Sequence, residues 1–386
     1  MSTVRLGIIG VGSMGSGHAG SILAGDIPRC KLVALCDERP EAMAGFPDVR
    51  QFCTSTELIH SGEVDAVLIA TPHYAHTTIG IEALQAGLHV LVEKPISVHK
   101  ADCERLIAAY TNPKQVFCAM FNQRTDPSYI KLRQLIQDGS LGTLRRINWI
   151  ITNWFRTQFY YNNGGWRATW AGEGGGVLLN QCPHQLDLWQ WLFGMPKKVR
   201  AFCHIGRYHD IEVEDDVTAY MEYESGATGV FLTSTGEAPG TNRLEVVGDQ
   251  GKVVIENGTL QFTRNEASMS EFCKTNLSRF DQPSIWNVNI PVSGGCGPQH
   301  KGILLNFTAA ILDGAELAAP APEGIHSVEL ANAMLMSSFE DRTIDLPVDA
   351  VAYEKLLKAK IATSSYVKKS SVGNAGGDDF EKSFRR

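Results

Sequence analysis

The sequence lacks the features that would place it in several specialised classes. No apolar run approaches the roughly 20 residues that a helix needs to cross a bilayer. The nine cysteines are scattered, odd in number and never spaced as CxxC, so they indicate neither a disulfide framework nor a zinc knuckle. The net charge is −7 and no long basic block occurs, which argues against nucleic acid as a partner. The first residues, "MSTVRLGIIGVGSMG", do not form a signal-peptide pattern. We therefore expect a cytoplasmic protein that binds neither membranes nor nucleic acids.

The first third of the chain alternates short apolar runs with helix-compatible segments. A chain of 386 residues with 44% hydrophobic residues can bury a substantial core and form two or three domains. Strands alternating with helices of about a dozen residues indicate βαβ units and a parallel sheet. We predict a Rossmann dinucleotide-binding domain over residues 1–122. Its strands are expected at residues 4–10, 31–37, 65–72, 89–95 and 115–121.

The rest of the chain has a different pattern. After a helical stretch at 127–139, β-rich runs follow one another between residues 143 and 263, interrupted by one helix-like segment at 174–194. Short turns between such runs favour an open, mostly antiparallel sheet. We predict an α+β domain over residues 123–366, closed by helices near 300–314 and 323–338, and a mobile tail over 367–386. The uncovered sheet face predicts a homodimer or homotetramer.

Three glycines in the first βα turn point to a cofactor. Gly10, Gly12 and Gly15 form GxGxxG directly after a strand and at the start of a helix, with Asp37 about twenty residues on. This context is the dinucleotide-binding arrangement, in which the glycines allow a tight turn, close approach of the pyrophosphate and close helix packing. Asp37 would bind the ribose hydroxyls and repel a 2′-phosphate, so NAD is favoured over NADP, although Arg39 could soften that choice.

Two further motifs end neighbouring strands of the same predicted sheet. Thr71-Pro72 ends the third strand and Glu93-Lys94-Pro95 the fourth, and ligands of open α/β sheets bind at these carboxyl ends. Pro95 favours an extended Lys94, is a candidate for a cis bond, and would aim the ammonium at the substrate side of the nicotinamide. The alternative is a surface lysine. The predicted cofactor contacts are Gly10, Gly12, Ser13, Met14, Gly15, Asp37, Glu38, Arg39, Thr71, Pro72, His73, His76, Glu93 and Lys94.

The segment "GGGVLLNQCPHQLDLWQWLFG" (174–194) places Asn180 and His184 four residues apart. On a helix such residues are neighbours, so they could form an acid–base pair, a metal pair or an internal hydrogen bond. Pro183 either kinks the helix or restarts it in its own first turn. We expect no metal site, because the Cys-Pro-His run lacks further ligands at metal spacing.

With these residues assembled, the chain resembles the glucose–fructose oxidoreductase, inositol dehydrogenase and rhizopine-catabolism (Gfo/Idh/MocA) family. The resemblance implies an NAD(P)-binding N-terminal domain, a C-terminal sheet used in dimer or tetramer contacts, and activity on sugars, sugar derivatives and polyols. It covers about residues 4–348 and rests on "GIIGVGSMGSGH" (7–18), "ATPHYAH" (70–76), "VLVEKP" (90–95), "FNQRTDP" (121–127), the segment 164–194 and "IDLPVD" (344–349).

The resemblance also implies catalytic roles. In this family the lysine of EKP and a histidine of the later helix flank the reacting carbinol, which assigns Lys94 and His184 as the catalytic pair. Histidine suits proton transfer near neutral pH, and an ammonium stabilises a developing alkoxide. The family usually has an aspartate where this chain has Asn180, which can position a substrate but cannot take a proton. This departure leaves open a changed or lost reaction.

Other residues are candidates for the substrate site. Arginine can form bidentate hydrogen bonds with hydroxyl-rich ligands, and tryptophan rings commonly pack on sugar rings. The alternatives are that the arginines form inter-domain ion pairs and that the aromatic residues pack in a core. Asp187 could orient the ring of His184 or pair elsewhere, and His18 is expected to be structural. The predicted substrate contacts are Lys94, Arg124, Tyr160, Trp166, Arg167, Asn180 and His184, with Tyr161 on the same wall.

We predict an NAD-dependent oxidoreductase that acts on a secondary carbinol of a sugar, a sugar derivative or an inositol-type polyol. One alternative is a glycoside-cleaving enzyme that oxidises its substrate transiently, eliminates the aglycone and regenerates NAD. A second alternative is a non-catalytic sensor that binds dinucleotide and sugar. The intact Lys94 and His184 argue against the sensor.

Overall fold

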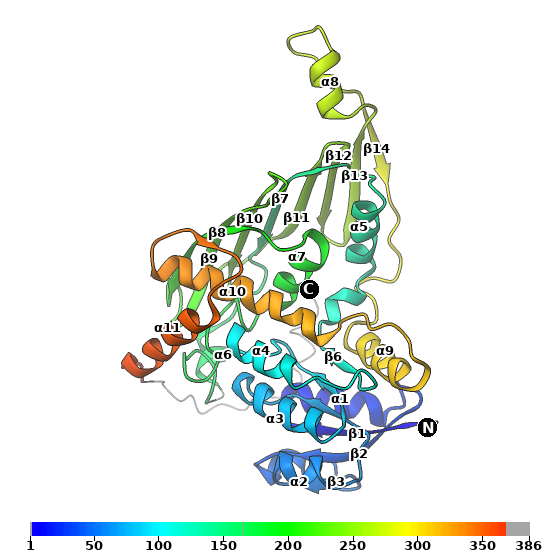
Figure 1. Cartoon of the computed structure of the whole chain (residues 1–386), viewed down its shortest axis with the longest axis vertical. Coiled ribbons are helices and arrows are strands. Elements are labelled where there is room, and N and C mark those ends of the chain that lie inside the picture. Colours follow the sequence, from blue (N-terminus) through cyan, green and yellow to red (C-terminus); the bar gives the residue numbers. More distant parts are fainter. Residues whose placement is uncertain (1, 164, 368–386) are drawn as a thin grey trace.

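The structure is a computed structural model, and it describes residues 2–163 and 165–367. Two sheets dominate it, with helices packed between them (Figure 1). The first sheet has six strands in the order β3-β2-β1-β4-β5-β6, and all of its neighbouring pairs are parallel. Its strands are β1 (Val4–Ile9), β2 (Cys30–Cys36), β3 (Arg50–Phe52), β4 (Ala66–Ile69), β5 (His89–Val92) and β6 (Phe117–Ala119).

The five predicted strands of this sheet are confirmed, because each is an apolar run that the sheet buries on both faces. The short strand β3 was not predicted, since it has three residues and no apolar run. The strand order is that of a Rossmann fold, in which the crevice for a dinucleotide lies where β1 and β4 meet. The accompanying helices are α1 (Ser13–Leu23), α2 (Ser55–Ile59), α3 (His73–Gln85) and α4 (Lys100–Ala108), with the 3-10 turn η1 (Pro40–Met43).

The second sheet has nine strands in the order β14-β13-β12-β11-β7-β10-β9-β8-β15. Among the described strands of this second sheet only the β7–β10 pair is parallel, so the predicted open, mostly antiparallel sheet is confirmed. The strands are β7 (Leu144–Ile151), β8 (Lys198–Ile205), β9 (Glu214–Glu222), β10 (Thr228–Ser234), β11 (Asn242–Gly248), β12 (Gly251–Glu256), β13 (Thr259–Asn265), β14 (Ile285–Asn289) and β15 (Ile344–Asp345).

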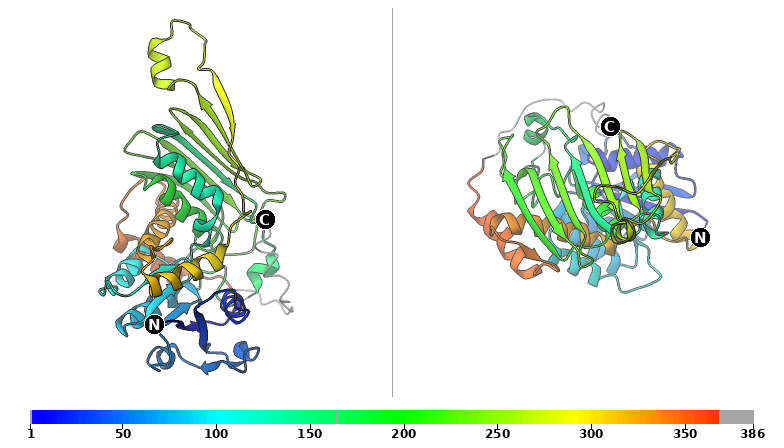
Figure 2. Two further views of the ribbon diagram at one scale, coloured as in Figure 1. Left: turned by 90° about the vertical axis from the view of Figure 1, so that its right-hand side faces the viewer. Right: turned by 90° about the horizontal axis from the view of Figure 1, so that it is seen from above.

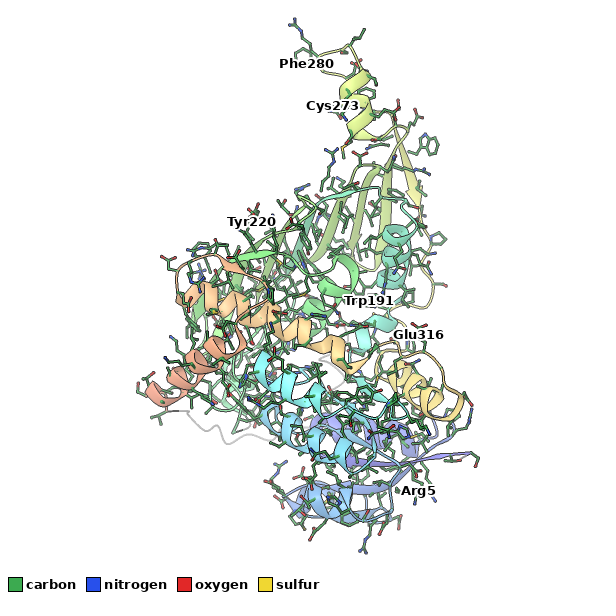
Figure 3. All side chains as sticks on the ribbon, viewed as in Figure 1. Arg5, Trp191, Tyr220, Cys273, Phe280 and Glu316 are labelled. Carbon is green, nitrogen blue, oxygen red and sulfur yellow. The ribbon has the colours of Figure 1, made fainter. Side chains whose placement is uncertain are left out.

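Helices cover one face of this sheet, and no described helix covers the other (Figure 2). The covered face packs Trp149, Trp189 and Phe231 into a second hydrophobic core. The uncovered face exposes large apolar side chains, among them Tyr220, which Figure 3 labels. The remaining helical elements are η2 (Asn122–Thr125), α5 (Pro127–Gln137), α6 (Gln158–Asn162), α7 (Pro183–Phe193), α8 (Met269–Thr275), α9 (Gln299–Asp313), η3 (Ala321–Glu323), α10 (Gly324–Phe339) and α11 (Ala350–Thr363).

Helix α8 and the loop after it form an arm that projects from the far end of β13 and β14, beyond the sheet (Figure 1). Figure 3 labels Cys273 and Phe280 on this arm. Phe280 is 90% exposed. The described residues include no helix long and apolar enough to cross a membrane.

One sequence-based expectation about the helices is wrong. Helix α9 was expected to close the second domain, but its buried side chains Ile303, Leu304 and Phe307 pack into the core of the first sheet. Of the two alternatives for the segment 174–194, the restart at Pro183 is confirmed: α7 begins at Pro183, because a proline lacks the N–H of a helix interior but suits a first turn. Helix α11 was not predicted. The boundary near residue 122 stays a prediction, and the tail beyond Val367 lies outside the described residues.

Candidate active site

The glycine turn between β1 and α1 forms one side of the site. Gly10 has φ +91°, and a Cβ there would lie 2.7 Å from the Ala70 carbonyl oxygen. A Cβ on Gly15 would lie 1.9 Å from the Gly10 oxygen, so these two glycines are required by close backbone packing. Gly12 differs, because a Cβ there would meet no protein atom within 4 Å. The space beside Gly12, at the N-terminus of α1, is therefore open to a ligand.

Asp37 closes this turn from the end of β2. Its Oδ2 accepts a hydrogen bond from the Val11 N–H at 2.9 Å, and its Oδ1 accepts one from the Arg39 N–H at 3.0 Å. The Arg39 guanidinium folds back onto the same carboxylate, with Nε 3.4 Å from Oδ1. Ser13, Pro72 and Glu38 are exposed around the turn, and Met14 is half-buried.

His76 links the two strand-end loops. Its Nδ1 lies 2.8 Å from the Pro95 carbonyl oxygen and its Nε2 lies 2.8 Å from the Thr71 carbonyl oxygen. The Lys94-Pro95 peptide bond is cis. Because both ring nitrogens face backbone carbonyls, His76 supports these loops, and its contact with a cofactor stays a prediction. His73 faces the second half of the chain, with Nδ1 3.3 Å from the Glu173 carbonyl oxygen.

Lys94 connects the two halves of the molecule at the site. Its Nζ donates a hydrogen bond to the Asn180 carbonyl oxygen at 3.0 Å. Burial lowers the pKa of the Lys94 ammonium, and the negative charges of Glu93 and Glu173 oppose that effect. The Asn180 side chain lies in a turn and not on a helix with His184, so the premise of a helical pair is wrong.

His184 lies in the first turn of α7, buried and edge-on to Phe121. Burial lowers its pKa well below the usual range, and the nearby charges of Lys94 and His300 lower it further. The imidazole is therefore neutral at physiological pH. Among the described residues its Nδ1 has no hydrogen-bond partner. An unpaired buried nitrogen is costly to a fold.

A buried network lies beneath Lys94. Glu93 Oε1 lies 2.8 Å from His18 Nε2, and its Oε2 accepts a hydrogen bond from the Lys94 N–H at 3.2 Å. Burial alone would raise the pKa of Glu93, but the bond and charge of His18, with the charges of His300 and Lys94, lower it to about 2. Glu93 thus supports Lys94 through oxygens that both have partners within the protein, and its contact with a cofactor stays a prediction.

Aromatic and cationic side chains form a wall beside Asn180. The Arg167 guanidinium lies over the rings of Trp166 at 4.4 Å and Tyr160 at 5.0 Å. The Tyr160 hydroxyl donates to Asn180 Oδ1 at 3.3 Å. Trp166 also lies edge-on to His73 at 5.0 Å. The structure therefore gathers Lys94, His184, Asn180, Tyr160, Trp166 and Arg167 at the junction of the two halves, next to the Rossmann sheet.

Comparisons with known proteins agree with this geometry. A sequence model described as the NAD-binding Rossmann fold of an oxidoreductase family matches residues 4–121, and a model of the Gfo/Idh/MocA C-terminal domain matches residues 129–254. The chain belongs to the Gfo/Idh/MocA oxidoreductase family. The inositol 2-dehydrogenase of Rhizobium meliloti is 26% identical over 369 residues, covering 89% of this chain and 99% of the relative.

Two further relatives support the assignment to the Gfo/Idh/MocA family. Inositol 2-dehydrogenase 1 of Saccharopolyspora erythraea is 32% identical over 263 residues, covering 66% of this chain and 74% of the relative. The WlbA dehydrogenase of Chromobacterium violaceum, solved in complex with NADH and UDP-GlcNAcA, superposes with a TM-score of 0.78 at 26% identity. That superposition covers 90% of this chain and 97% of the solved chain.

This Gfo/Idh/MocA protein is an NAD-dependent oxidoreductase that acts on CH–OH groups. Its residues fit the cofactor: Gly12 leaves open space at a helix N-terminus, and Asp37 is held where the ribose hydroxyls would lie. The Thr71 hydroxyl is buried and has no hydrogen-bond partner among the described residues, which fits a polar contact with the cofactor at this strand end.

The structure corrects the predicted substrate role of Arg124. The Arg124 side chain is 1% exposed, and its Nε and one terminal nitrogen donate to the Asp187 carboxylate at 2.7 and 2.6 Å. The other terminal nitrogen donates to Glu323 at 2.5 Å and to the Ala318 carbonyl oxygen at 3.2 Å. Because each guanidinium nitrogen of Arg124 already donates within the protein, none remains to form a bidentate hydrogen bond with a substrate. Asp187 forms an ion pair with Arg124 and does not orient His184.

Sequence reasoning missed two residues of the site in this family member. Glu173 accepts a hydrogen bond from the Asn180 amide, and its charge acts on Lys94. His300, at the start of α9, lies 5.6 Å from the His18 ring, and burial lowers its pKa to about 4. Glu173 lies within the segment 164–194 but was not singled out there, and His300 belongs to no motif, so tertiary contacts reveal the part that each plays. No group of three or more His, Cys, Asp and Glu side chains in the described ranges is arranged to hold a metal ion.

Proposed function

We propose that this enzyme transfers a hydride between NAD and a secondary carbinol of a sugar, a sugar derivative or an inositol-type polyol. The observation that carries the proposal is that Lys94, whose ammonium binds the Asn180 carbonyl oxygen beside the Rossmann sheet, lies close enough to His184 for its charge to act on the imidazole. The names of the relatives, which are inositol dehydrogenases and a dehydrogenase bound to UDP-GlcNAcA, support the substrate class.

The two side chains have complementary roles in this proposal. When bound, the nicotinamide ring supplies the acceptor for the hydride. His184 accepts the hydroxyl proton, because its imidazole is neutral at physiological pH. Lys94 holds the same oxygen and stabilises the negative charge that develops on it. Burial strengthens this electrostatic interaction, since the site excludes much of the water that would screen it.

The wall beside Asn180 is proposed to bind the rest of the substrate. Tyr160 and Trp166 offer ring faces, and Arg167 offers charged donors for hydroxyl or carboxylate groups. The charges of Arg156 and Arg167 act on Lys94 together with the opposite charges of Glu93 and Glu173. Because a guanidinium can pair with a carboxylate, we include uronic acids among the candidate substrates.

The proposal is tested by measuring NADH formation with a panel of inositols, sugars and uronic acids, with NAD and NADP compared. Lys94→Met and His184→Asn should each lower kcat by at least about a hundredfold, the range that proton transfer and alkoxide stabilisation contribute. Lys31→Met and His60→Asn, at exposed positions, serve as controls. Full activity of either catalytic-pair variant would refute the assignment. Release of an aglycone without net NADH would instead indicate the glycoside-cleaving alternative.

We also propose that the uncovered face of the large sheet forms a homodimer or homotetramer contact. On that face Phe202 is 53% and Tyr220 is 42% exposed, and Ile150 and Val230 lie on neighbouring strands. Contiguous apolar groups of this kind mark association surfaces. Light scattering of the wild type should give an oligomer, and Tyr220→Glu with Phe202→Glu should give a monomer. A monomeric wild type would contradict this proposal.

We propose a cytoplasmic location, because all nine cysteines are free thiols, as is usual in a reducing compartment. Fractionation of cells expressing the tagged chain tests it, and recovery outside the cytoplasm would contradict it.

A further inference from the structure

Glu173 is a buried carboxylate in the turn that precedes the three glycines. It is 1% exposed, although it belongs to a residue type that is almost never buried without a partner. Its Oε2 accepts a hydrogen bond from the Ala168 N–H at 2.7 Å. Its Oε1 accepts one from the Asn180 side-chain amide and lies 3.8 Å from a terminal nitrogen of Arg167. One carboxylate thus contacts both Asn180 and Arg167, which belongs to the wall beside it.

These contacts fix the orientation of the Asn180 amide. An ionised carboxylate can only accept hydrogen bonds, so the Nδ2 group of Asn180 must face Glu173. The other end of the amide, Oδ1, then faces the Tyr160 hydroxyl at 3.3 Å. Position 180 therefore presents an acceptor toward the substrate wall, as one oxygen of a carboxylate would. Because Nδ2 is already bound to a charged acceptor, the amide dipole is polarised and its oxygen becomes a stronger acceptor.

Glu173 also places a negative charge close to Lys94. The Asn180 residue joins the two groups, since its side chain binds Glu173 and its carbonyl oxygen accepts a hydrogen bond from the Lys94 ammonium at 3.0 Å. The charge of Glu173 favours the protonated form of Lys94, against the burial that disfavours it. The same turn is held from outside by Glu212, whose Oε1 accepts a hydrogen bond from the Trp170 N–H at 2.9 Å.

We propose that Glu173 is a positioning residue that supplies the negative charge that the family's aspartate would place at position 180. By binding the Asn180 Nδ2 group, Glu173 holds Asn180 Oδ1 in place as a hydrogen-bond acceptor for the substrate. The inference rests on the proposed function and makes it more specific. A fixed acceptor at position 180 selects a substrate that carries a hydroxyl donor there, so a deoxy or O-methyl analogue at that position binds less well. It also explains how the site keeps its charge balance with an asparagine in place of the aspartate.

The test moves the charge between the two positions. In Glu173→Gln the charge is lost, and kcat should fall by about tenfold, as for loss of a charge-assisted hydrogen bond. In Asn180→Asp two carboxylates meet, so they share a proton and activity should fall by about tenfold or more above neutral pH. The double variant that combines both substitutions places an amide donor at position 173 against a carboxylate at position 180, and kcat should return to within about threefold of wild type. Glu212→Gln, which alters the same turn without contacting Asn180, is the matched control and should keep the wild-type kcat.

A second measurement needs no substrate. Reductive methylation with ¹³C-formaldehyde makes each lysine visible by NMR, and Lys94→Ala identifies the Lys94 signal. In the cofactor-free protein the titration midpoint of Lys94 should move to lower pH in Glu173→Gln and stay unchanged in Glu212→Gln. A purely structural role of Glu173 predicts no such shift and no rescue.

The outcomes separate this inference from the proposed function. If no polyol is oxidised but the Lys94 titration shifts as expected, the substrate assignment fails and the link between Glu173 and Lys94 stands. If polyols are oxidised but Asn180→Asp keeps full activity at every pH, the positioning role of Glu173 is overturned. A double variant no more active than its weaker single variant overturns it as well.

Discussion

Replacing Gly12 by alanine separates cofactor binding from folding. The backbone of Gly12, at φ −74° and ψ −162°, suits alanine, and the added Cβ would meet no protein atom within 4 Å. The free energy of unfolding should therefore change by no more than about 0.5 kcal/mol. The methyl group would, however, occupy the space that the pyrophosphate needs for close approach. NAD affinity should fall by about a hundredfold, which corresponds to ~2.7 kcal/mol.

The neighbouring glycines provide the contrast. In Gly15→Ala the Cβ would lie 1.9 Å from the Gly10 oxygen, a separation that forces the turn apart. Overpacking of this kind should cost about 3 kcal/mol or more of folding free energy, and the loss of NAD binding would then follow from damage to the turn. Gly20, on the same helix, is the control: it is exposed, and its Cβ would also meet nothing within 4 Å. Gly20→Ala should gain about 0.5–1 kcal/mol and bind NAD normally.

Two assays decide the outcome. Thermal and urea unfolding of the cofactor-free variants gives their stability, and titration calorimetry with NAD gives their affinity. If Gly12→Ala folds normally and binds NAD as tightly as wild type, the pyrophosphate does not lie at this turn. The inferred arrangement of the cofactor would then be wrong, whatever the family resemblance suggests.

Three other predictions concern buried polar groups. Arg124→Met leaves the buried Asp187 carboxylate without its counterion, so urea unfolding should show a loss of about 3–5 kcal/mol. KM should be unchanged, and a raised KM at unchanged stability would restore a substrate role for Arg124. Burial raises the pKa of Glu214 to about 7, so the folded protein keeps a proton that the unfolded chain loses, and stability falls as the pH rises from about 4.5 to 7. That fall should shrink in Glu214→Gln, and an identical pH profile would contradict the assignment. Tyr160→Phe removes the hydroxyl that donates to Asn180, so KM should rise by about three- to tenfold, with kcat less affected. Steady-state kinetics that show a lower kcat at unchanged KM would place Tyr160 in the chemical step.

The parts of the fold that were predicted correctly are those that local sequence determines. Short apolar runs form the parallel strands β1, β2, β4, β5 and β6, and the GxGxxG turn lies where its spacing placed it. The short strand β3 escaped prediction because "RQF" pairs with β2 through backbone bonds that any side chains permit. Helix α9 looks like any amphipathic helix, and nothing in its own residues states which core it joins.

The candidate site could be predicted in part for the same reason. Lys94 and His184 lie in motifs, and the structure brings them to one place. Arg124 has the right residue type, but its partners Asp187 and Glu323 are 63 and 199 residues away in sequence, so its pairing was invisible. The role of Glu173 depends on a turn that folds its carboxylate back onto Asn180, and a helix-like pattern concealed that turn.

The membership of α9 in the first core affects how this protein can fold during synthesis. The apolar surface of the Rossmann sheet that Ile303, Leu304 and Phe307 cover stays bare until the ribosome has made more than 300 residues. A fragment that ends near residue 122 would keep that surface exposed and should aggregate. The nucleotide-binding half is thus the first to be synthesised and among the last to be completed, so the two halves cannot mature independently.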